Sequence, residues 1–150
     1  MTQNVDDLHL RAGTERLLRL HGSIWELSCA AGCLQGVTPW RDEGASTALR
    51  RCRHCDDIAR PAVVWFGEAL DSQIVARAIE ASECDVFITV GTSSVVYPAA
   101  GLVHEARRRG AFTVEINTEA TSVSEVVDLT IPGPAEEVLP ALDAFLLANA

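Results

Sequence analysis

The sequence predicts an α/β protein with a partial doubly wound parallel sheet, because strand-like and helix-like segments alternate along the chain. Residues 86–90 are a short run of apolar and β-branched residues, the composition of a strand buried on both faces, and residues 112–116 form the next predicted strand. Amphipathic stretches separate such runs, which is typical of parallel sheets covered by helices. With 150 residues, 48% of them hydrophobic, the chain is long enough to bury a core.

Helix signals stand between the predicted strands. Asp71 suits a helix N-cap, because the residues after it place apolar side chains at helical spacing. A second helix is predicted from Pro98 to Gly110, with arginines in its last turn and glycine as its stop. A closing helix is predicted around Pro140, which starts or kinks it. Further strands are expected at residues 17–20, 24–27, 62–66 and 129–131, and the strand at 62–66 is expected to be buried.

The turn after the predicted strand 86–90, which we take as the central strand, is the first candidate ligand site. Gly91, Thr92, Ser93 and Ser94 form a small polar turn ahead of a helix. Small residues let a ligand approach the backbone, and hydroxyl and helix N–H groups can meet its polar atoms. Many such turns only join a strand to a helix, so the pattern leaves both interpretations open.

Composition and charge limit the partners to be expected. The chain carries 12 basic and 21 acidic residues, a net charge of −9, which disfavours non-specific binding to nucleic acid. No apolar run approaches the ~20 residues of a membrane span, and the first residues lack the pattern of a signal peptide. A cytoplasmic protein without nucleic-acid or membrane partners is expected, and its oligomeric state is left open.

Four of the five cysteines form two close pairs, Cys29 with Cys33 and Cys52 with Cys55. Four thiolates suit tetrahedral zinc, and zinc ribbons present them as two short pairs separated by a longer loop. The surrounding residues 28–60 are poor in aliphatic side chains, so metal binding would supply folding energy. The first pair is one residue wider than the commonest gap, and a site without metal or a redox pair remain alternatives to structural zinc.

Other polar residues are candidates that these patterns alone leave undecided. His21 lies between a predicted strand and Gly22, where a catalytic or a structural imidazole is reasonable. Gln3, Asn4 and Asp6 lie together near the start of the chain. Their side chains suit turns and caps as well as ligand binding.

Taken together, these segments resemble the sirtuin family. The resemblance covers nearly the whole chain and keeps the family's order of segments. The matching segments are Gln3–His9, Arg11–Gly13, Leu20–Gly22, both cysteine pairs, Arg60–Pro61, Val63–Glu68, Gly91–Ser93, Val96–Ala100, Glu115–Asn117 and Gly133–Ala135. Residues 65–68 and 97–100 are most similar to the sirtuins that remove acidic acyl groups as well as acetyl groups.

The resemblance implies an NAD-dependent protein-lysine deacylase. Sirtuins move the acyl group of a lysine side chain onto the ADP-ribose of NAD and release nicotinamide. NAD is thus the expected co-substrate, and an acyl-lysine protein or peptide the expected partner. Deacetylation is expected, with removal of succinyl or malonyl groups as a further expectation. His21 matches the general base of the family, which activates a ribose hydroxyl.

Binding residues are implied by the same resemblance. The nicotinamide and ribose side of NAD is matched by Gln3, Asn4, Val5 and Asp6. The adenosine side is matched by Gly91, Thr92, Ser93, Asn117, Thr118, Glu119 and Ala135. One wall of the peptide cleft, where an extended substrate adds to a sheet, is matched by Val64, Trp65, Phe66, Gly67 and Glu68. The four paired cysteines match a structural zinc site remote from the chemistry.

The implied organisation has two parts. Residues 1–27 and 61–150 are expected to form a Rossmann-like NAD-binding part, and residues 28–60 a zinc-binding, loop-rich insert. The strand and glycine-rich turn that grip the pyrophosphate in sirtuins have no match here. A C-terminal piece of a sirtuin is therefore expected, with an open sheet edge and little or no turnover on its own. The alternatives are a non-catalytic, zinc-stabilised module that binds nucleotide or peptide, and an inactive fragment.

Overall fold

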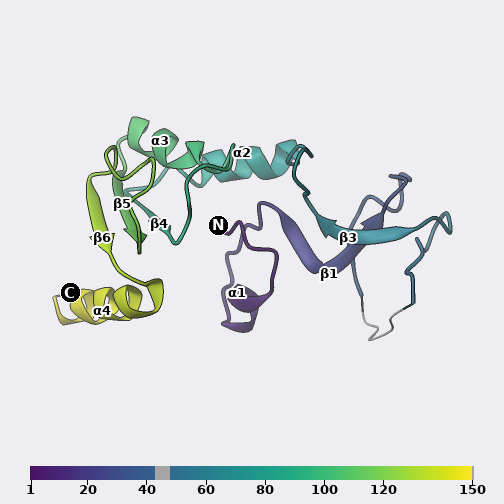
Figure 1. Ribbon diagram of the computed structural model, residues 1–150, viewed down its shortest axis with the longest axis horizontal. Helices are drawn as coiled ribbons and strands as arrows, with labels where there is room; N and C mark the ends of the chain where they lie inside the picture. The colour runs from purple at the N-terminus through teal and green to yellow at the C-terminus, as the bar shows by residue number, and fades with distance from the viewer. Residues whose placement is uncertain (43–47, 150) are drawn as a thin grey trace. The chain divides into compact units, whose positions relative to one another are not determined.

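The computed structural model describes residues 1–42 and 48–149 and divides into two compact units, Met1–Ile74 and Val75–Ala150 (Figure 1). Each unit has its own sheet, and each is described by itself. Within the described residues, no helix is long and apolar enough to cross a bilayer.

The first unit is built on an antiparallel sheet with the strand order β2–β1–β3. The long strand β1 (Gly22–Cys29) pairs with β2 (Trp40–Arg41) on one side and with β3 (Ala59–Val63) on the other. A short helix, α1 (Leu8–Arg11), comes before β1 in the chain. Strand β3 therefore pairs with both ends of β1. His21 adjoins one of these ends, and Cys29 lies at the other.

This sheet corrects two of the predicted strands. The strand expected at 62–66 ends at residue 63 and runs antiparallel to β1, while Trp65 and Phe66 beyond it are 53% and 99% exposed. The strand expected at 17–20 is reduced to the isolated bridge between Thr2 and Arg19. A short apolar run fits a parallel and an antiparallel strand equally well, so the sequence could not distinguish them.

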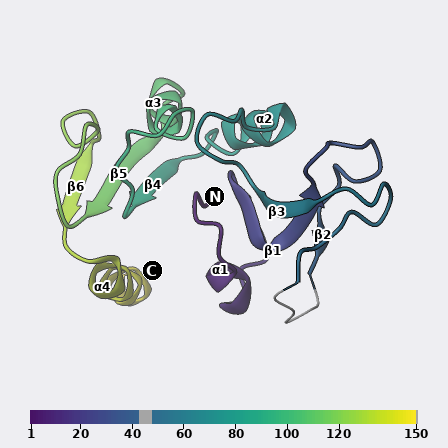
Figure 2. The same cartoon turned by 45° about the vertical axis from the view of Figure 1, so that its right-hand side comes forward.

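The second unit contains a parallel sheet with the strand order β4–β5–β6, as the alternation of strands and helices predicts. Its strands are β4 (Val86–Val90), β5 (Phe112–Asn117) and β6 (Leu129–Pro132), which Figure 2 shows side by side. Helix α3 (Gly101–Arg108) connects β4 to β5, and α4 (Ala135–Ala148) follows β6. The predicted bounds of β4 are confirmed residue for residue.

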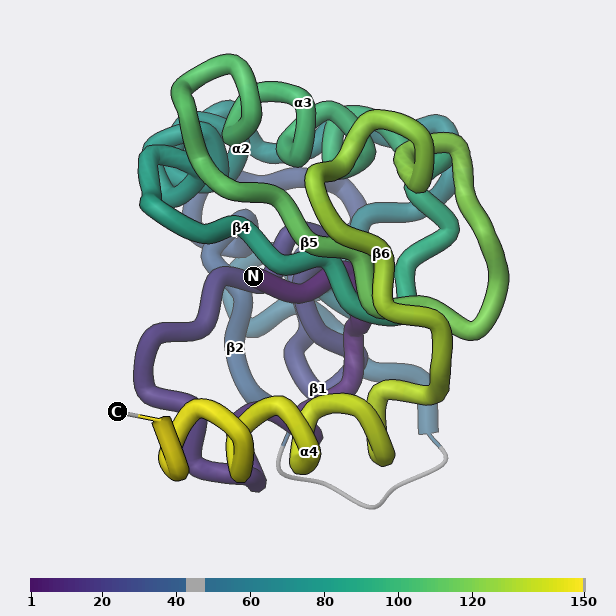
Figure 3. Tube along the Cα trace, turned by 90° about the vertical axis from the view of Figure 1, so that its left-hand side faces the viewer, coloured from purple at the N-terminus to yellow at the C-terminus, as the bar shows by residue number. Residues whose placement is uncertain are grey.

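The central strand of this sheet is β5 rather than β4. Figure 3 shows β5 between its two neighbours. Residues 113–116 of β5 are all buried, whereas Val86 and Ile88 of β4 are 53% and 43% exposed. The expectation that β4 is buried on both faces is therefore wrong, because β4 pairs on one side only and lies at an edge of the described sheet.

The helices follow their sequence signals closely. Asp71 Oδ1 accepts hydrogen bonds from the backbone N–H groups of Gln73 and Ile74, at 2.7 and 3.2 Å, at the start of α2 (Ser72–Glu80). Helix α3 packs against β4 and β5 through its buried apolar residues and stops before Gly110, whose φ of +95° suits glycine. Pro140 lies inside α4, which begins five residues earlier, so it does not start that helix.

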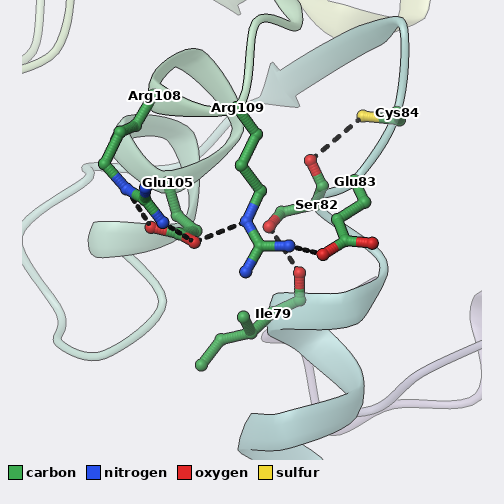
Figure 4. A network of polar contacts seen from close by, with 7 residues as sticks. All are labelled: Ile79, Ser82, Glu83, Cys84, Glu105, Arg108 and Arg109. Carbon is green, nitrogen blue, oxygen red and sulfur yellow. Dashed lines mark hydrogen bonds and ion pairs between the residues drawn. The ribbon is translucent and has the colours of Figure 1, made fainter.

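Polar contacts join the loop before β4 to the end of α3 (Figure 4). Arg109 forms ion pairs with Glu83 of that loop and with Glu105 of α3. The hydroxyl of Ser82, which is fully buried, donates to the carbonyl of Ile79 at 2.6 Å. The ion pairs of Arg109 therefore hold the loop before β4 close to the C-terminal end of α3.

The packing of β5 predicts a difference between two identical substitutions. Ile116 is fully buried, so Ile116→Val should lower the free energy of unfolding by about 0.5–1.5 kcal/mol, through the lost methylene and the cavity it leaves. Ile88→Val removes the same group from the exposed edge strand and should cost less. Urea unfolding of both variants checks this, and equal losses would mean that β5 is not the core strand.

Candidate functional site

The N-terminal segment lies alongside the residues that lead into β1. The backbone of Thr2 donates to the Leu18 carbonyl and accepts from the Leu20 N–H, both at 2.9 Å. Further on, the Ile24 N–H donates to the Val5 carbonyl at 2.9 Å. These bonds run in parallel register, so the predicted nicotinamide-side residues are held beside the histidine that precedes β1.

His21 is oriented by a hydrogen bond through one of its ring nitrogens. Its Nδ1 lies 3.0 Å from the backbone carbonyl oxygen of Gln3. A carbonyl oxygen can only accept, so Nδ1 carries the proton, and in the neutral imidazole Nε2 has a free lone pair. The backbone carbonyl of His21 also accepts from the Val64 N–H at 3.0 Å, which anchors the residue to the end of β3. The ring is thus held with its basic nitrogen available.

The other polar residues near the N-terminus, Asn4 and Asp6, make local hydrogen bonds. Asp6 Oδ1 accepts from the backbone N–H of Leu8 at 3.0 Å, at the start of α1. Asn4 is exposed, and its backbone N–H donates to the hydroxyl of Thr2 at 3.1 Å. Asp6 therefore closes an Asx turn before α1, a local contact that its residue type favours.

Residues 64–68 form a turn that Arg60 holds in place. The guanidinium of Arg60 makes two bonds to the Glu68 carboxylate, at 2.6 and 2.9 Å, and lies 5.8 Å from the ring centre of Trp65. Glu68 also accepts from the Trp65 N–H at 3.1 Å. The bonds from Arg60 and from this N–H lower the pKa of Glu68 to about 2. The exposed ring of Phe66 is therefore presented from a fixed turn next to the edge strand β3.

The four paired cysteines come together at the other end of the β1–β3 pair. Their sulfur atoms all lie within 4.8 Å of one another, with Cys29 Sγ 3.5 Å from Cys55 Sγ and Cys33 Sγ 3.6 Å from Cys52 Sγ. Thiolates around a tetrahedral metal, at metal–sulfur distances of about 2.3 Å, lie roughly 3.8 Å apart. The arrangement therefore fits a four-thiolate metal site.

The surroundings of the cysteines shift their pKa values in different directions. The N–H of His54 points to Cys52 Sγ at 3.5 Å, and a backbone bond from Cys33 is the main cause that lowers the pKa of Cys29 to about 7, whereas burial raises the pKa of Cys33 to about 12. A Cβ atom at Gly36 would lie 2.6–2.8 Å from atoms of three of these cysteines. Only glycine leaves the sulfur atoms room to converge.

In the second unit, two predicted adenosine-side segments meet at the carboxyl ends of β4 and β5. Asn117 Nδ2 donates to the Thr92 carbonyl at 2.8 Å, and its Oδ1 accepts from the Thr118 N–H at 2.9 Å. The Gly91 N–H donates to the carbonyl of Ile116 at 2.9 Å. The segments Gly91–Ser93 and Asn117–Glu119 thus adjoin, as expected for the ends of parallel strands.

Ala135, the last predicted adenosine-side residue, is the first residue of α4. It follows Gly133, whose N–H donates to the Asn117 carbonyl at 2.9 Å, so the start of α4 is tied to the same edge of the sheet. Glu115, a buried acid two residues before Asn117, lies in the matching segment Glu115–Asn117, but the sequence did not indicate a role for it. The only signal was a charged residue in the middle of a predicted strand.

Comparison with known proteins identifies the family. The model of the Sir2 family matches residues 1–98. An "NAD-dependent protein deacylase 2" of Pyrobaculum aerophilum is 46% identical over 143 residues, which cover 95% of this chain and 56% of the relative.

Two solved structures are similar to the whole described fold. A Sir2 homologue in complex with NAD superimposes with a TM-score of 0.91 and 38% identity, over 99% of this chain and 57% of that one. Sir2Af2 bound to a myristoylated histone peptide superimposes with a TM-score of 0.76 and 40% identity, over 93% of this chain and 60% of that one. The chain thus spans a little more than half the length of the proteins it matches. On the family match and these similarities, the chain belongs to the Sir2 family, the sirtuins.

Proposed function

We propose that this chain carries the general base, the adenosine-binding edge and one peptide-binding wall of an NAD-dependent protein-lysine deacylase. The observation that carries the proposal is the orientation of His21, whose Nδ1–H is bound to the Gln3 carbonyl while Nε2 is left basic. Membership of the Sir2 family and the similarity to a Sir2 homologue–NAD complex support NAD as co-substrate.

In the proposed reaction, the amide oxygen of acyl-lysine would bond to the ribose carbon of NAD as nicotinamide leaves, and the acyl group would then pass to that ribose while water completes the release of lysine. His21 Nε2 accepts the proton of a ribose hydroxyl, which makes that oxygen the better nucleophile. The Gln3 carbonyl stabilises the imidazolium that forms, because the Nδ1–H bond becomes charge-assisted once the ring is protonated. The bond from Val64 to the His21 carbonyl keeps the ring at the end of β3 during this transfer.

The remaining site residues are proposed in the roles that the resemblance implies. Residues 3–6 would contact the nicotinamide and its ribose, and Gly91–Ser93, Asn117–Glu119 and Ala135 the adenosine. Small residues and backbone groups dominate the adenosine-side set, which suits close approach by a nucleotide. The hydrogen bonds of Asn117 to Thr92 and Thr118 would keep this edge ordered before the nucleotide binds.

For the peptide, the proposed contact is the edge of β3 together with the turn 64–68. Strand β3 pairs with β1 on one side, and an extended peptide can add to the other. The histone peptide bound to Sir2Af2 supports a peptide or protein substrate. Acetyl-lysine is the proposed substrate, with succinyl- and malonyl-lysine as the further prediction from the sequence.

We further propose that the four cysteines hold a structural zinc ion. Zinc would lie at the Cys29 end of β1, while His21 adjoins the other end, eight residues and about 26 Å away along an extended strand. At that distance the metal would stabilise the sheet and take no part in acyl transfer. The cytoplasmic location and the lack of nucleic-acid partners stay predictions from composition.

Replacing the proposed base gives the test of function. His21→Ala should lower the rate of NAD-dependent deacetylation ~100-fold or more, because it removes the proposed acceptor of the ribose proton. The assay joins this chain to the preceding segment of the Pyrobaculum aerophilum relative and measures deacetylation of an acetyl-lysine peptide. His104→Ala, an exposed histidine on α3, is the matched control and should keep the rate. An active chimera that tolerates His21→Ala would refute the assignment.

Metal analysis tests the cysteine site. Chain purified without chelator should contain about one zinc per molecule, the stoichiometry of a four-thiolate site. Cys52→Ser removes one ligand and should release the metal and increase amide exchange in β1 and β3. Cys84→Ser, which changes the exposed cysteine outside the cluster, should keep the metal. Full retention of zinc by Cys52→Ser would count against these four ligands.

The turn 64–68 predicts a pH dependence. The pKa of folded Glu68 is about 2, below its ordinary value of 4.5, so the stabilisation by its pair with Arg60 is present above 4.5 and is lost as the pH falls through about 2. The amide signal of Trp65, which donates to Glu68, should stay constant in NMR spectra from pH 7 to about 3.5 and shift only as the pH approaches about 2. Glu68→Gln should shift that signal at every pH, and Glu15→Gln should not. A midpoint near 4.5 in the parent protein would show that the pair does not form.

A further inference from the structure

One face of β5 is polar and yet buried. Thr113 and Glu115 point to the same side of the strand by the two-residue period, and they are 0% and 2% exposed. A buried carboxyl group in the central strand of a sheet is costly unless its oxygen atoms are bonded. The partners of Glu115 therefore indicate why an acid is present there.

Both carboxylate oxygens of Glu115 are bonded to hydroxyl groups of the connection between β5 and β6. The Thr121 hydroxyl donates to Oε1, and the Ser124 hydroxyl donates to Oε2. Each hydroxyl oxygen in turn accepts a backbone N–H bond, Ser124 from Thr121 at 2.7 Å and Thr121 from Val123 at 3.2 Å. The carboxylate is therefore the end point of two short hydrogen-bond chains that set the turn 121–124.

The direction of these bonds requires two acceptor oxygens at position 115. Each hydroxyl has one proton and uses it on Glu115, because its oxygen already accepts from the backbone. A glutamine would offer one acceptor and turn an NH₂ group toward the other hydroxyl. A carboxylate satisfies both donors, and linked bonds of this kind strengthen one another.

The turn 121–124 reaches the proposed adenosine edge through Ser122. Its hydroxyl donates to the carbonyl of Ser94 at 3.2 Å. Ser94 is 5% exposed, has a φ of +56° and ends the turn that follows β4. A residue other than glycine in this conformation needs support from its surroundings. The turn that Glu115 orders is thus one of the contacts that hold residues 91–94.

We propose that Glu115 is a positioning residue of the nucleotide-binding edge, acting through Thr121, Ser124 and Ser122 on the turn 91–94. The buried carboxylate would act through these hydroxyl groups and not by contact with the nucleotide. Through the turn 121–124 it supports the bond from Ser122 to the Ser94 carbonyl, and the bond from Asn117 to the Thr92 carbonyl is a second support of the turn 91–94. That the ligand is a nucleotide rests on the proposed function, whereas the coupling between the two turns rests on these contacts alone.

The test removes one hydroxyl without changing the shape of its side chain. Thr121→Val deletes the donor to Glu115, and Thr121→Ser keeps it. Thr130→Val, at an exposed position on β6, is the control for the same substitution elsewhere. Val103→Ala, in the buried face of α3, is the control for a general loss of stability. Glu115→Gln tests the need for two acceptors.

Two measurements on the full chain are compared, the affinity for ADP-ribose by calorimetry and the amide exchange of residues 91–94. Thr121→Val and Glu115→Gln should weaken ADP-ribose binding about tenfold, the effect of losing a hydrogen bond to a charged group, and should speed exchange at 91–94. Thr121→Ser, Thr130→Val and Val103→Ala should keep the affinity and the local exchange pattern.

Unchanged affinity and unchanged exchange at 91–94 in Thr121→Val would overturn the positioning role. Equal effects in Thr121→Val and Val103→Ala would also overturn it, because a general loss of stability would then explain both. If the parent chain does not bind ADP-ribose, the proposed nucleotide site fails. The exchange of residues 91–94 still decides whether Glu115 controls that turn.

Discussion

The parallel pairing of β4 with β5 is the constraint on which the proposed nucleotide-binding edge depends. Val90 pairs with Ile116, and the Gly91 N–H continues the pairing onto the Ile116 carbonyl. Parallel strands end at the same edge of their sheet, so the turn after β4 must lie next to Asn117. A register shift of one residue would turn Asn117 to the opposite face and break its bond to the Thr92 carbonyl.

In the first unit, the β1–β3 pair has a comparable role. Gly22 pairs with Val63 at one end of β1 and Cys29 pairs with Ala59 at the other. His21 and the cysteine cluster therefore adjoin opposite ends of the same two strands. A metal bound by the cysteines would hold these strands together and so support the histidine without contacting it. This arrangement explains how a metal remote from the proposed chemistry can still be needed for it.

The sequence predicted the elements whose signals are local. Residues 86–90, the Asp71 cap and the glycine stop at 110 need only their neighbours to be recognised, and all three are confirmed. The spacing of the four cysteines likewise predicted a cluster that the structure brings together. The predictions that failed concern features that depend on distant partners. The apolar run of β3, for example, does not reveal that this strand pairs antiparallel with β1.

The buried polar face of β5 also depends on distant partners. Thr113 and Glu115 alternate with apolar residues, a pattern that favours one solvated face. Both are instead buried, and residues of the connection that follows β5 supply their hydrogen-bond partners, Asp128 for Thr113 and two hydroxyls for Glu115. No propensity of β5 itself indicates that a loop of threonine and serine residues will satisfy a buried acid.

NMR titration of the isotope-labelled chain with ADP-ribose tests most directly whether a nucleotide binds at the ends of β4 and β5. Saturable shifts are expected for the backbone amides of residues 91–93 and 117–119, with the amides around the four cysteines unaffected. If these six amides stay unchanged at saturating ADP-ribose, or if the shifts are confined to other residues, the proposed edge is not the binding site.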